Sequence, residues 1–228
     1  MQRIFDIIFS SLSLLILSPL MVAIGTLLRL TGEGEIFYLQ ERIGKGGKTF
    51  KLYKFATMLK NSPSLGTGTV TVKNDSRILP AGKFLRKTKI NELPQLLNIF
   101  LGDMSVIGPR PLTHQTFGAY TKETQCRILK VRPGLSGIGS IIFRGEEDML
   151  AGENSSLDFY NTIIAPYKGL LETWYVANYT LRTYFEAIVV TIVVMFDPRS
   201  QVVWKAFKDL PPPPNELMTV LNYPRNYY

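Results

Sequence analysis

The residues with the clearest chemical potential lie in a basic stretch centred on Glu92. Asn91 is a favoured helix N-cap, and Pro94 is tolerated in a first turn because the amides there have no intrahelical partner. Apolar residues then recur at helical spacing up to Leu101, and Gly102 is a good helix stop. The pattern therefore predicts a helix that is capped by Asn91 and carries the carboxylate of Glu92 in its first turn.

Basic side chains stand on both sides of this carboxylate, with Lys83, Arg86, Lys87 and Lys89 before it and Arg110 after it. A helix N-terminus beside clustered ammonium and guanidinium groups forms an anion site, and a carboxylate within such a site indicates metal or phosphate chemistry. From residue types alone, a capped amphipathic helix on a solvated basic surface explains the pattern equally well.

Composition narrows the class of partner. The 228 residues suffice for one sizeable domain or for a domain plus a membrane element. The formal charge of +8 implies nucleic acid, anionic lipid or a phosphorylated substrate. Aromatic residues are sparse in the basic stretch 73–89, and zinc-finger, dinucleotide-binding and P-loop motifs are absent from the sequence. A phosphorylated small molecule or lipid therefore fits better than a nucleic acid. One cysteine, Cys126, and one histidine, His114, exclude an intrachain disulfide and a Cys/His metal cluster, which suits a reducing cytoplasm.

The chain begins with a nearly continuous apolar segment, residues 4–30, that is long enough to cross a bilayer as one helix. However, Pro19 removes a helical hydrogen bond and predicts a kink at Ser18-Pro19. Arg3 and Arg29 flank the segment, and the positive-inside tendency places both ends on the cytoplasmic face. We therefore expect a re-entrant membrane helix that breaks at Ser18 and Pro19. A true span and a signal peptide are the alternatives.

The middle of the chain predicts strands. Residues 35–39 and 49–55 read as two strands around the glycine-rich turn 44–47, and residues 66–72 alternate like a further short strand. The lysines of the hairpin suit either anionic headgroups or a solvated sheet edge. Together with the helices, these strands predict a small mixed α/β cytoplasmic domain.

The C-terminal third predicts helix over residues 170–196, ending in an apolar run too short to span a bilayer. We expect an amphipathic interfacial helix there, lying against the membrane or packing on the first helix. Four aromatic residues suit either an interface or a core: Trp174, Tyr175, Tyr179 and Tyr184. Prolines 211–214 favour polyproline II and end the compact domain, so residues 215–228 form a tail that docks on the body or on a second subunit.

Short blocks along nearly the whole chain follow an order that is specific to one family. They are Arg3-Ile4-Phe5-Asp6 before Ser18-Pro19; Gln40, Arg42, Gly44 and Tyr53-Lys54-Phe55; Leu85-Arg86 through Glu92-Leu93-Pro94-Gln95-Leu96; Gly102-Asp103-Met104-Ser105 with Gly108-Pro109-Arg110-Pro111; Val131-Arg132-Pro133-Gly134; and Tyr175-Val176-Ala177-Asn178. In this order they resemble the bacterial sugar transferases known as monotopic phosphoglycosyl transferases. The resemblance implies transfer of a phosphosugar from a UDP-sugar to a membrane polyprenyl (undecaprenyl) phosphate, with Mg²⁺ required and UMP released. This reaction is the first membrane step of glycoconjugate and polysaccharide assembly.

The resemblance also implies an organisation and a location. Residues 1–31 would be the re-entrant membrane helix, residues 32–210 the cytosolic catalytic domain and residues 211–228 a Pro-rich tail. The protein would sit in the bacterial inner membrane with its active site on the cytoplasmic face. A lipid bilayer is thus an expected partner and nucleic acid is not, while a homo-oligomer stays open.

Residue by residue, the resemblance assigns catalysis to Asn91 and Glu92 and makes Glu92 the Mg²⁺ ligand. It assigns substrate phosphate binding to five basic residues: Lys54, Arg86, Arg110, Arg132 and Arg144. For Arg144, an ion pair with one of the acids at positions 146–148 is the alternative.

Position 91 departs from the family, whose members usually carry an Asp that serves as the nucleophile. A neutral amide is not an effective nucleophile, although Asn and Asp cap a helix almost equally well. Three hypotheses follow. Glu92 is the nucleophile or magnesium ligand of a variant; the chain is an engineered or naturally silent form, such as a membrane scaffold or precursor-binding homologue; or transfer is direct, with charge stabilisation by Arg86, Arg110 and Mg²⁺. Ala56 also departs from the family, where a basic residue is usual, and two departures favour a natural, active subfamily.

Overall fold

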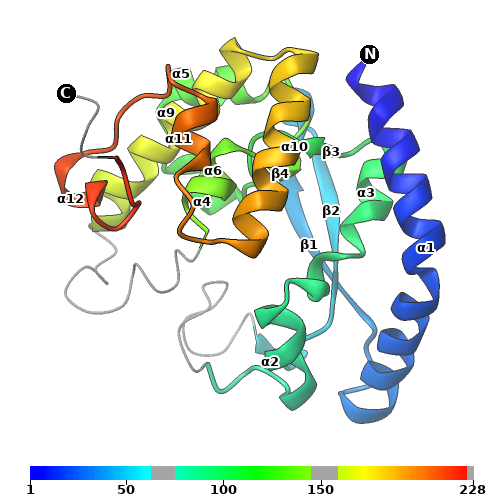
Figure 1. Cartoon of the computed structure of the whole chain (residues 1–228). Helices are drawn as coiled ribbons and strands as arrows, with labels where there is room; N and C mark the ends of the chain where they lie inside the picture. Colours follow the sequence, from blue (N-terminus) through cyan, green and yellow to red (C-terminus); the bar gives the residue numbers. More distant parts are fainter. Residues whose placement is uncertain (63–74, 145–158, 225–228) are drawn as a thin grey trace. The chain divides into compact units, whose positions relative to one another are not determined.

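The computed structural model describes residues 1–62, 75–144 and 159–224. The chain divides into two compact units, each described by itself: unit 1 comprises Met1–Gln2, Arg42–Thr49 and Asp103–Tyr228, and unit 2 comprises Arg3–Glu41 and Phe50–Gly102. Helices and strands occur in both, which confirms the mixed α/β class (Figure 1).

Unit 2 holds all or most of α1 (Gln2–Thr31), β1 (Phe37–Ile43), β2 (Thr49–Phe55), α2 (Pro80–Lys87), the 3-10 turn η3 (Ile90–Glu92) and α3 (Gln95–Leu101). Unit 1 holds η1 (Lys45–Gly47), β3 (Ser105–Ile107), α4 (His114–Gly118), α5 (Lys122–Ile128), β4 (Gly134–Ser136), α6 (Ile138–Ile142), η4 (Tyr160–Ile164), α9 (Ala165–Ala177), α10 (Leu181–Phe196), α11 (Val202–Ala206) and α12 (Asn215–Met218).

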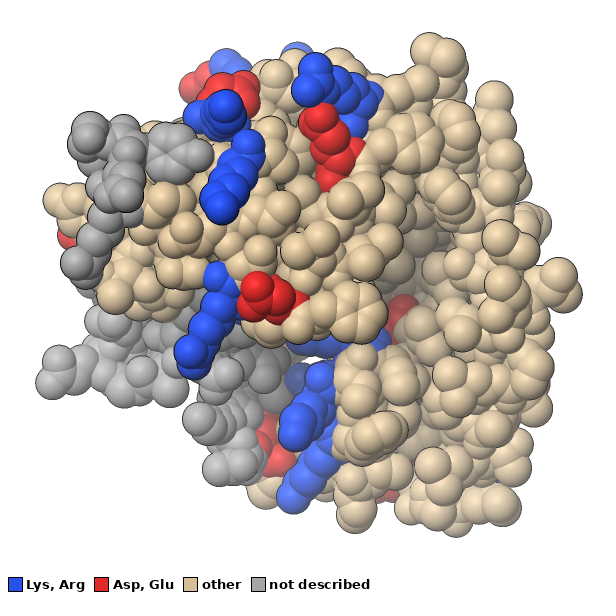
Figure 2. Space-filling view, viewed as in Figure 1, with Lys and Arg blue, Asp and Glu red and all other residues tan. Residues whose placement is uncertain are grey.

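Among the described residues, α1 is the one helix whose length and composition suffice to cross a membrane. Only 11% of its most apolar 18-residue window is buried, whereas a core helix of a soluble protein is mostly buried. The side of α1 seen in Figure 2 is almost entirely free of charged side chains. The structure therefore has an N-terminal apolar helix that could span a membrane, and its apolar surface is exposed.

Helix α1 continues through Pro19 without ending. Pro19 has no N–H to offer the carbonyl of Leu15, four residues earlier. The hydroxyl of Ser18 donates to that carbonyl at 2.9 Å and so replaces the missing backbone hydrogen bond. This substitution explains how a Ser-Pro pair is accommodated inside a helix. The break at Ser18 and Pro19 and the re-entrant path stay predictions.

Helix α3 lies between β2 and α1 (Figure 1). On the strand side, the fully buried amide of Asn98 donates to the carbonyl of Lys51 at 2.8 Å and accepts from the N–H of Tyr53 at 3.0 Å. On the other side, the guanidinium of Arg3 donates to the carbonyls of Ile99 and Phe100 in the last turn of α3. The carbonyl of Ile99 also accepts from the N–H of Gly102 at 3.1 Å, so Arg3 adds a side-chain donor to the backbone cap of this helix end. Side chains on both faces thus fix the position of α3.

Helix α3 begins at Gln95, so the prediction that Asn91 caps it is wrong. Asn91 does not act as a capping residue, because its Oδ1 accepts no hydrogen bond among the described residues. The chain instead makes η3, whose hydrogen bonds span three residues. The predicted helix stop is confirmed, because Gly102 follows α3 with a left-handed φ of 99°.

The hairpin is confirmed with a shifted first strand. Strand β2 has the predicted bounds, whereas β1 covers Phe37–Ile43 and not residues 35–39. The glycine-rich turn between them forms η1. The strand predicted at residues 66–72 lies outside the described residues.

In unit 1, β3 and β4 form a short parallel pair in which Ser105 lies opposite Gly134 and Ile107 opposite Ser136. Helix α10 packs against β3 and α6, and α9 packs against α5 and α6. The backbone beyond β3 approaches β4 very closely: a Cβ on Gly134 would lie 2.1 Å from the nitrogen of Gly108. This contact requires glycine, and it fixes the start of the Gly108–Pro111 loop.

Replacing Gly134 by Ala should lower the free energy of unfolding by about 2–3 kcal/mol, because the new methyl would overlap backbone that holds the strand pair. Thermal unfolding of the purified protein in detergent would measure the loss. Gly118→Ala is the matched control, since its Cβ would meet nothing within 4 Å. Equal unfolding temperatures for the two variants would contradict the expected overlap.

The helix predicted over residues 170–196 is two helices, because α9 ends at Ala177 and α10 begins at Leu181. Thr180 separates them, and its hydroxyl accepts from the N–H of Thr183 at 3.1 Å as the N-cap of α10. The far part of α10 exposes large apolar side chains, including Met195 and Phe196.

The sequence left open whether the four aromatic residues of this region lie at an interface or in the core, and they do not all behave alike. Tyr175 and Tyr184 are fully buried and belong to the core, where the hydroxyl of Tyr175 donates to the carbonyl of Ile107 at 3.1 Å. Tyr179 is 41% exposed, and the indole N–H of Trp174 donates to Asp209.

The described part of the Pro-rich tail docks on the body, in unit 1. The hydroxyl of Tyr167 donates to the carbonyl of Pro211 at 2.9 Å. The rings of Trp204 and Tyr223 meet edge to face with centroids 4.9 Å apart. Of the two alternatives, the first therefore holds for these residues.

Candidate functional site

The central pair of the candidate site is Glu92 and Lys54, in unit 2. Glu92 ends η3 and Lys54 lies near the end of β2, and Lys54 Nζ donates to Glu92 Oε1 at 3.0 Å. The two side chains are 24% and 20% exposed, so the pair is partly shielded yet open to a ligand. Asn98 helps to hold this geometry, because it fastens α3, just beyond η3, to the same strand.

Asn91 lies beside this pair in the chain, but its side chain is buried, with the residue only 5% exposed. Its amide oxygen Oδ1 has no hydrogen-bond partner among the described residues. A buried, unsatisfied amide oxygen costs stability, and such groups are often found at catalytic positions. The residue at the family's nucleophile position is thus enclosed, neutral and incompletely hydrogen-bonded.

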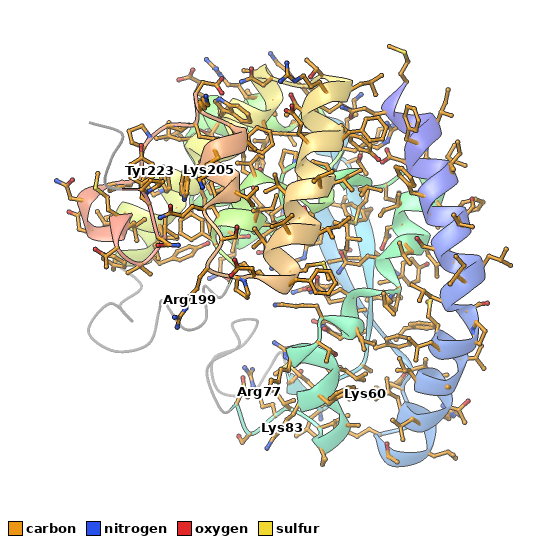
Figure 3. All side chains as sticks on the ribbon, in the orientation of Figure 1. Lys60, Arg77, Lys83, Arg199, Lys205 and Tyr223 are labelled. Carbon is orange, nitrogen blue, oxygen red and sulfur yellow. The ribbon has the colours of Figure 1, made fainter. Side chains whose placement is uncertain are left out.

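The basic residues ahead of Glu92 lie on α2 and the turn after it. Lys83, Lys87 and Lys89 are exposed, and Figure 3 shows Lys83 at the surface of α2. Arg86 is only partly exposed, and its guanidinium lies 3.7 Å from the sulfur of Met58. Arg86 is therefore the cation of this group with the most restricted position.

The remaining predicted phosphate ligands belong to unit 1. Arg110 is exposed in the loop after β3. Arg132 precedes β4, and its segment touches that loop: the carbonyl of Pro109 accepts from the N–H of Gly134 at 2.8 Å. Arg144 is the last residue before an undescribed segment, and the acids proposed as its alternative partners lie in that segment. The structure thus joins Lys54 to Glu92 in one unit and the Arg110 loop to the Arg132 segment in the other.

A cavity beside Arg110 is too small for a nucleotide. It has a volume of about 20 Å³, room for one water molecule, and is lined mostly by apolar residues such as Pro109, Leu112 and Phe117. Any nucleotide contact of Arg110 would therefore be made from the exposed surface of its loop.

Two polar residues that support these groups were not singled out from the sequence. Asn98 is one, and Glu172 on α9 is the other: it is 3% exposed, and its Oε1 accepts from the backbone N–H of Arg110 at 3.2 Å. Burial raises the pKa of Glu172 to about 7, although the hydrogen bond from Arg110 and the charges of Lys168 and Arg110 act in the opposite direction. The available signal was an acid three residues before the apolar Tyr175, on the same face of a predicted helix.

The predicted Mg²⁺ must be judged on the donors that the chain provides. Among the described residues, no group of three or more His, Cys, Asp or Glu side chains could hold a metal ion. Mg²⁺ is commonly bound through one or two carboxylates together with substrate phosphates and waters. Glu92 alone therefore fits a magnesium site that is completed by a diphosphate substrate and does not fit a closed protein site.

Comparison with known proteins gives the family. The model of the bacterial sugar transferase family matches residues 1–198. The chain is 38% identical over 163 residues to the UDP-glucose:undecaprenyl-phosphate glucose-1-phosphate transferase of Klebsiella pneumoniae, covering 69% of this chain and 34% of the relative. It is 33% identical over 195 residues to the undecaprenyl-phosphate galactose phosphotransferase of Salmonella typhimurium, covering 79% and 37%. It is 36% identical over 159 residues to the exopolysaccharide production protein ExoY of Rhizobium meliloti, covering 64% and 70%.

The chain thus spans about a third of the length of the first two relatives and more than two thirds of the third. The family match, by contrast, includes both units, the apolar helix α1 and every predicted site residue. The chain belongs to the bacterial sugar transferase family.

Proposed function

We propose that the protein is a phosphoglycosyl transferase that moves a phosphosugar from a UDP-sugar to a membrane polyprenyl phosphate. The observation that carries the proposal is the family match over residues 1–198. Relatives that are 33–38% identical are named as transferases of glucose 1-phosphate or galactose phosphate to undecaprenyl phosphate. The reaction would be the first membrane step of polysaccharide assembly, in line with the name of the ExoY relative.

The reaction requires an oxygen nucleophile to attack the phosphorus that bears the sugar. The new P–O bond forms as the bond to the bridging oxygen breaks, and that oxygen leaves with UMP. In a two-step route, the carboxylate of Glu92 would take the phosphosugar and then pass it to the polyprenyl phosphate. In a direct route, an oxygen of the polyprenyl phosphate would attack the donor itself. Both routes give the same products, a polyprenyl diphosphate sugar and UMP.

The side chains suit either route. Lys54 orients the carboxylate of Glu92, and it is a point charge for a donor phosphate. Arg86, Arg110 and Arg132 would bind phosphate oxygens and stabilise charge that develops on the leaving UMP. Mg²⁺, when bound through Glu92 and the donor diphosphate, would neutralise phosphate charge and polarise the reacting phosphorus.

The proposed place of the reaction is the cytoplasmic face of the bacterial inner membrane. Helix α1 carries Arg3 and Arg29 near its two ends, and its exposed apolar surface suits a helix embedded in lipid. A re-entrant path would keep both ends on the face where soluble UDP-sugars are available. The apolar side chains exposed on α10 suit contact with the same membrane surface.

A second candidate is a membrane scaffold that binds precursors without turnover. Asn91 favours it, because an amide stands where the family usually has its nucleophilic carboxylate. This candidate predicts binding of a UDP-sugar without release of UMP.

A donor screen tests the proposal. Purified protein in detergent would receive polyprenyl phosphate, Mg²⁺ and a panel of UDP-sugars, and UMP release would be measured. We expect release with one or a few donors, and a reaction without polyprenyl phosphate distinguishes transfer from hydrolysis. No UMP from any donor, with wild type and Asn91→Asp alike, would reject the enzyme and leave the scaffold.

A further inference from the structure

Glu172 is a buried acid directly behind the loop that carries Arg110. Its Oε1 accepts the backbone N–H of Arg110, and its second oxygen, Oε2, is buried without a hydrogen-bond partner among the described residues. A carboxylate with one enclosed, unpaired oxygen is an unstable arrangement. The reaction routes above give this acid no task.

The surroundings of Glu172 are built to admit its carboxyl group. On α6, a Cβ at Gly139 would lie 2.5 Å from Glu172 Oε1, so any larger residue would displace the carboxyl group. One turn earlier on α9, Lys168 is 7% exposed, with its ammonium 4.9 Å from the ring centre of Phe143 and 5.6 Å from that of Tyr160. A cation held over aromatic rings keeps its position. The carboxyl group of Glu172 is therefore held in one position by the residues around it.

The charge of Glu172 changes in the neutral pH range. Burial raises its pKa to about 7, and the charged groups that face it are Arg110 from the β3 loop and Lys168 from its own helix. On α6 the neighbour is the uncharged Gly139. Below this pKa the acid is neutral, and above it a negative charge stands behind Arg110.

We propose that Glu172 is a positioning residue, which holds the backbone of Arg110 for phosphate binding and makes that binding weaker when Glu172 is ionised. This inference rests on the proposed function, in which Arg110 binds a donor phosphate. A negative charge behind Arg110 repels the incoming anion, and by thermodynamic linkage a bound phosphate favours the protonated acid. The hydrogen bond to the N–H of Arg110 is available in both states, because either form keeps an acceptor oxygen.

The test is the affinity of the full-length protein for UDP with Mg²⁺, measured calorimetrically from about pH 6 to about pH 8.5. Glu172→Gln keeps the acceptor oxygen and the volume but cannot ionise. Glu172→Ala removes the acceptor as well, and Gly139→Ala displaces the carboxyl group. Glu123→Gln is the matched control, because Glu123 is an exposed acid of the same unit. Since the terminal phosphate of UDP also titrates, the ratio of variant to wild-type affinity is compared at each pH.

Relative to Glu172→Gln, wild type should lose affinity about fivefold as the pH rises across this range, and Glu123→Gln should follow wild type. Glu172→Ala and Gly139→Ala should bind UDP more weakly than Glu172→Gln at every pH. If wild type binds UDP but its pH profile matches that of Glu172→Gln, or if Glu172→Ala binds as tightly as Glu172→Gln, the inference is wrong and the proposed function stands. If wild type fails to bind UDP at any pH, the proposed function is wrong and the inference falls with it.

Discussion

The largest loss is expected from Glu92→Gln, which should reduce the rate of UMP release by about 100- to 1,000-fold. Gln keeps the size of the side chain and an oxygen that can accept from Lys54, so the turn and its ion-pair partner stay in place. It removes the negative charge that either attacks the phosphosugar or binds Mg²⁺. The measurement is UMP release with the best donor from the screen.

The control for this loss is Glu186→Gln, which changes a partly exposed acid on α10 that pairs with Arg182. It should keep wild-type activity, and both variants should unfold at wild-type temperature. Full activity of Glu92→Gln would remove Glu92 from the mechanism and leave direct transfer supported by the arginines.

The largest gain is expected from Asn91→Asp, about 10- to 100-fold in UMP release. The variant places a carboxylate where the family usually carries its nucleophile. Because residue 91 is 5% exposed and its Oδ1 lacks a partner among the described residues, burial should raise the pKa of the new carboxyl group. The gain should therefore increase with pH as that group ionises. Initial rates across neutral pH and a donor labelled in its sugar would show both the gain and covalent labelling of the protein.

Asn91→Leu is the control for this gain, because it has a similar volume and no carboxylate, and it should stay at or below wild type. If UMP release falls in Glu92→Gln and rises in Asn91→Asp, positions 91 and 92 act together, and the natural Asn91 weakens their activity. Wild-type turnover that Asn91→Asp leaves unchanged argues against position 91 as a nucleophile. Donor binding without turnover in wild type, with turnover in Asn91→Asp, identifies the natural chain as silent.

Local patterns predicted the elements near the site well. Strand β2 was correct at both ends, and Gly102 ended α3 as expected, because alternation and a left-handed glycine are properties of a few adjacent residues. The cap at Asn91 failed because residues 90–92 form a 3-10 turn and the α-helix begins only at Gln95. The break between α9 and α10 was missed although Thr180 is a good N-cap.

The contacts that organise the site could not be predicted in this way, because they join distant positions. Lys54 and Glu92 are 38 residues apart, and Glu172 reaches Arg110 across 62. The side chain of Asn98 contacts backbone 45 and 47 residues earlier. The resemblance assigned Lys54, Glu92 and Arg110 to the same reaction. It contained no information on Asn98 or Glu172, which hold other parts of the chain in position.

Because Arg3 is attached to the end of α3, the length of this helix sets the distance between that contact and the turn that carries Glu92. At 1.5 Å per residue, the seven residues of α3 span about 10 Å between the anchored end and the turn that carries Glu92. One residue inserted into α3 would lengthen the helix by about 1.5 Å and rotate Glu92 by about 100° away from Lys54. The distance from the Arg3 contact to the carboxylate of Glu92 is therefore set by the number of residues in a single short helix.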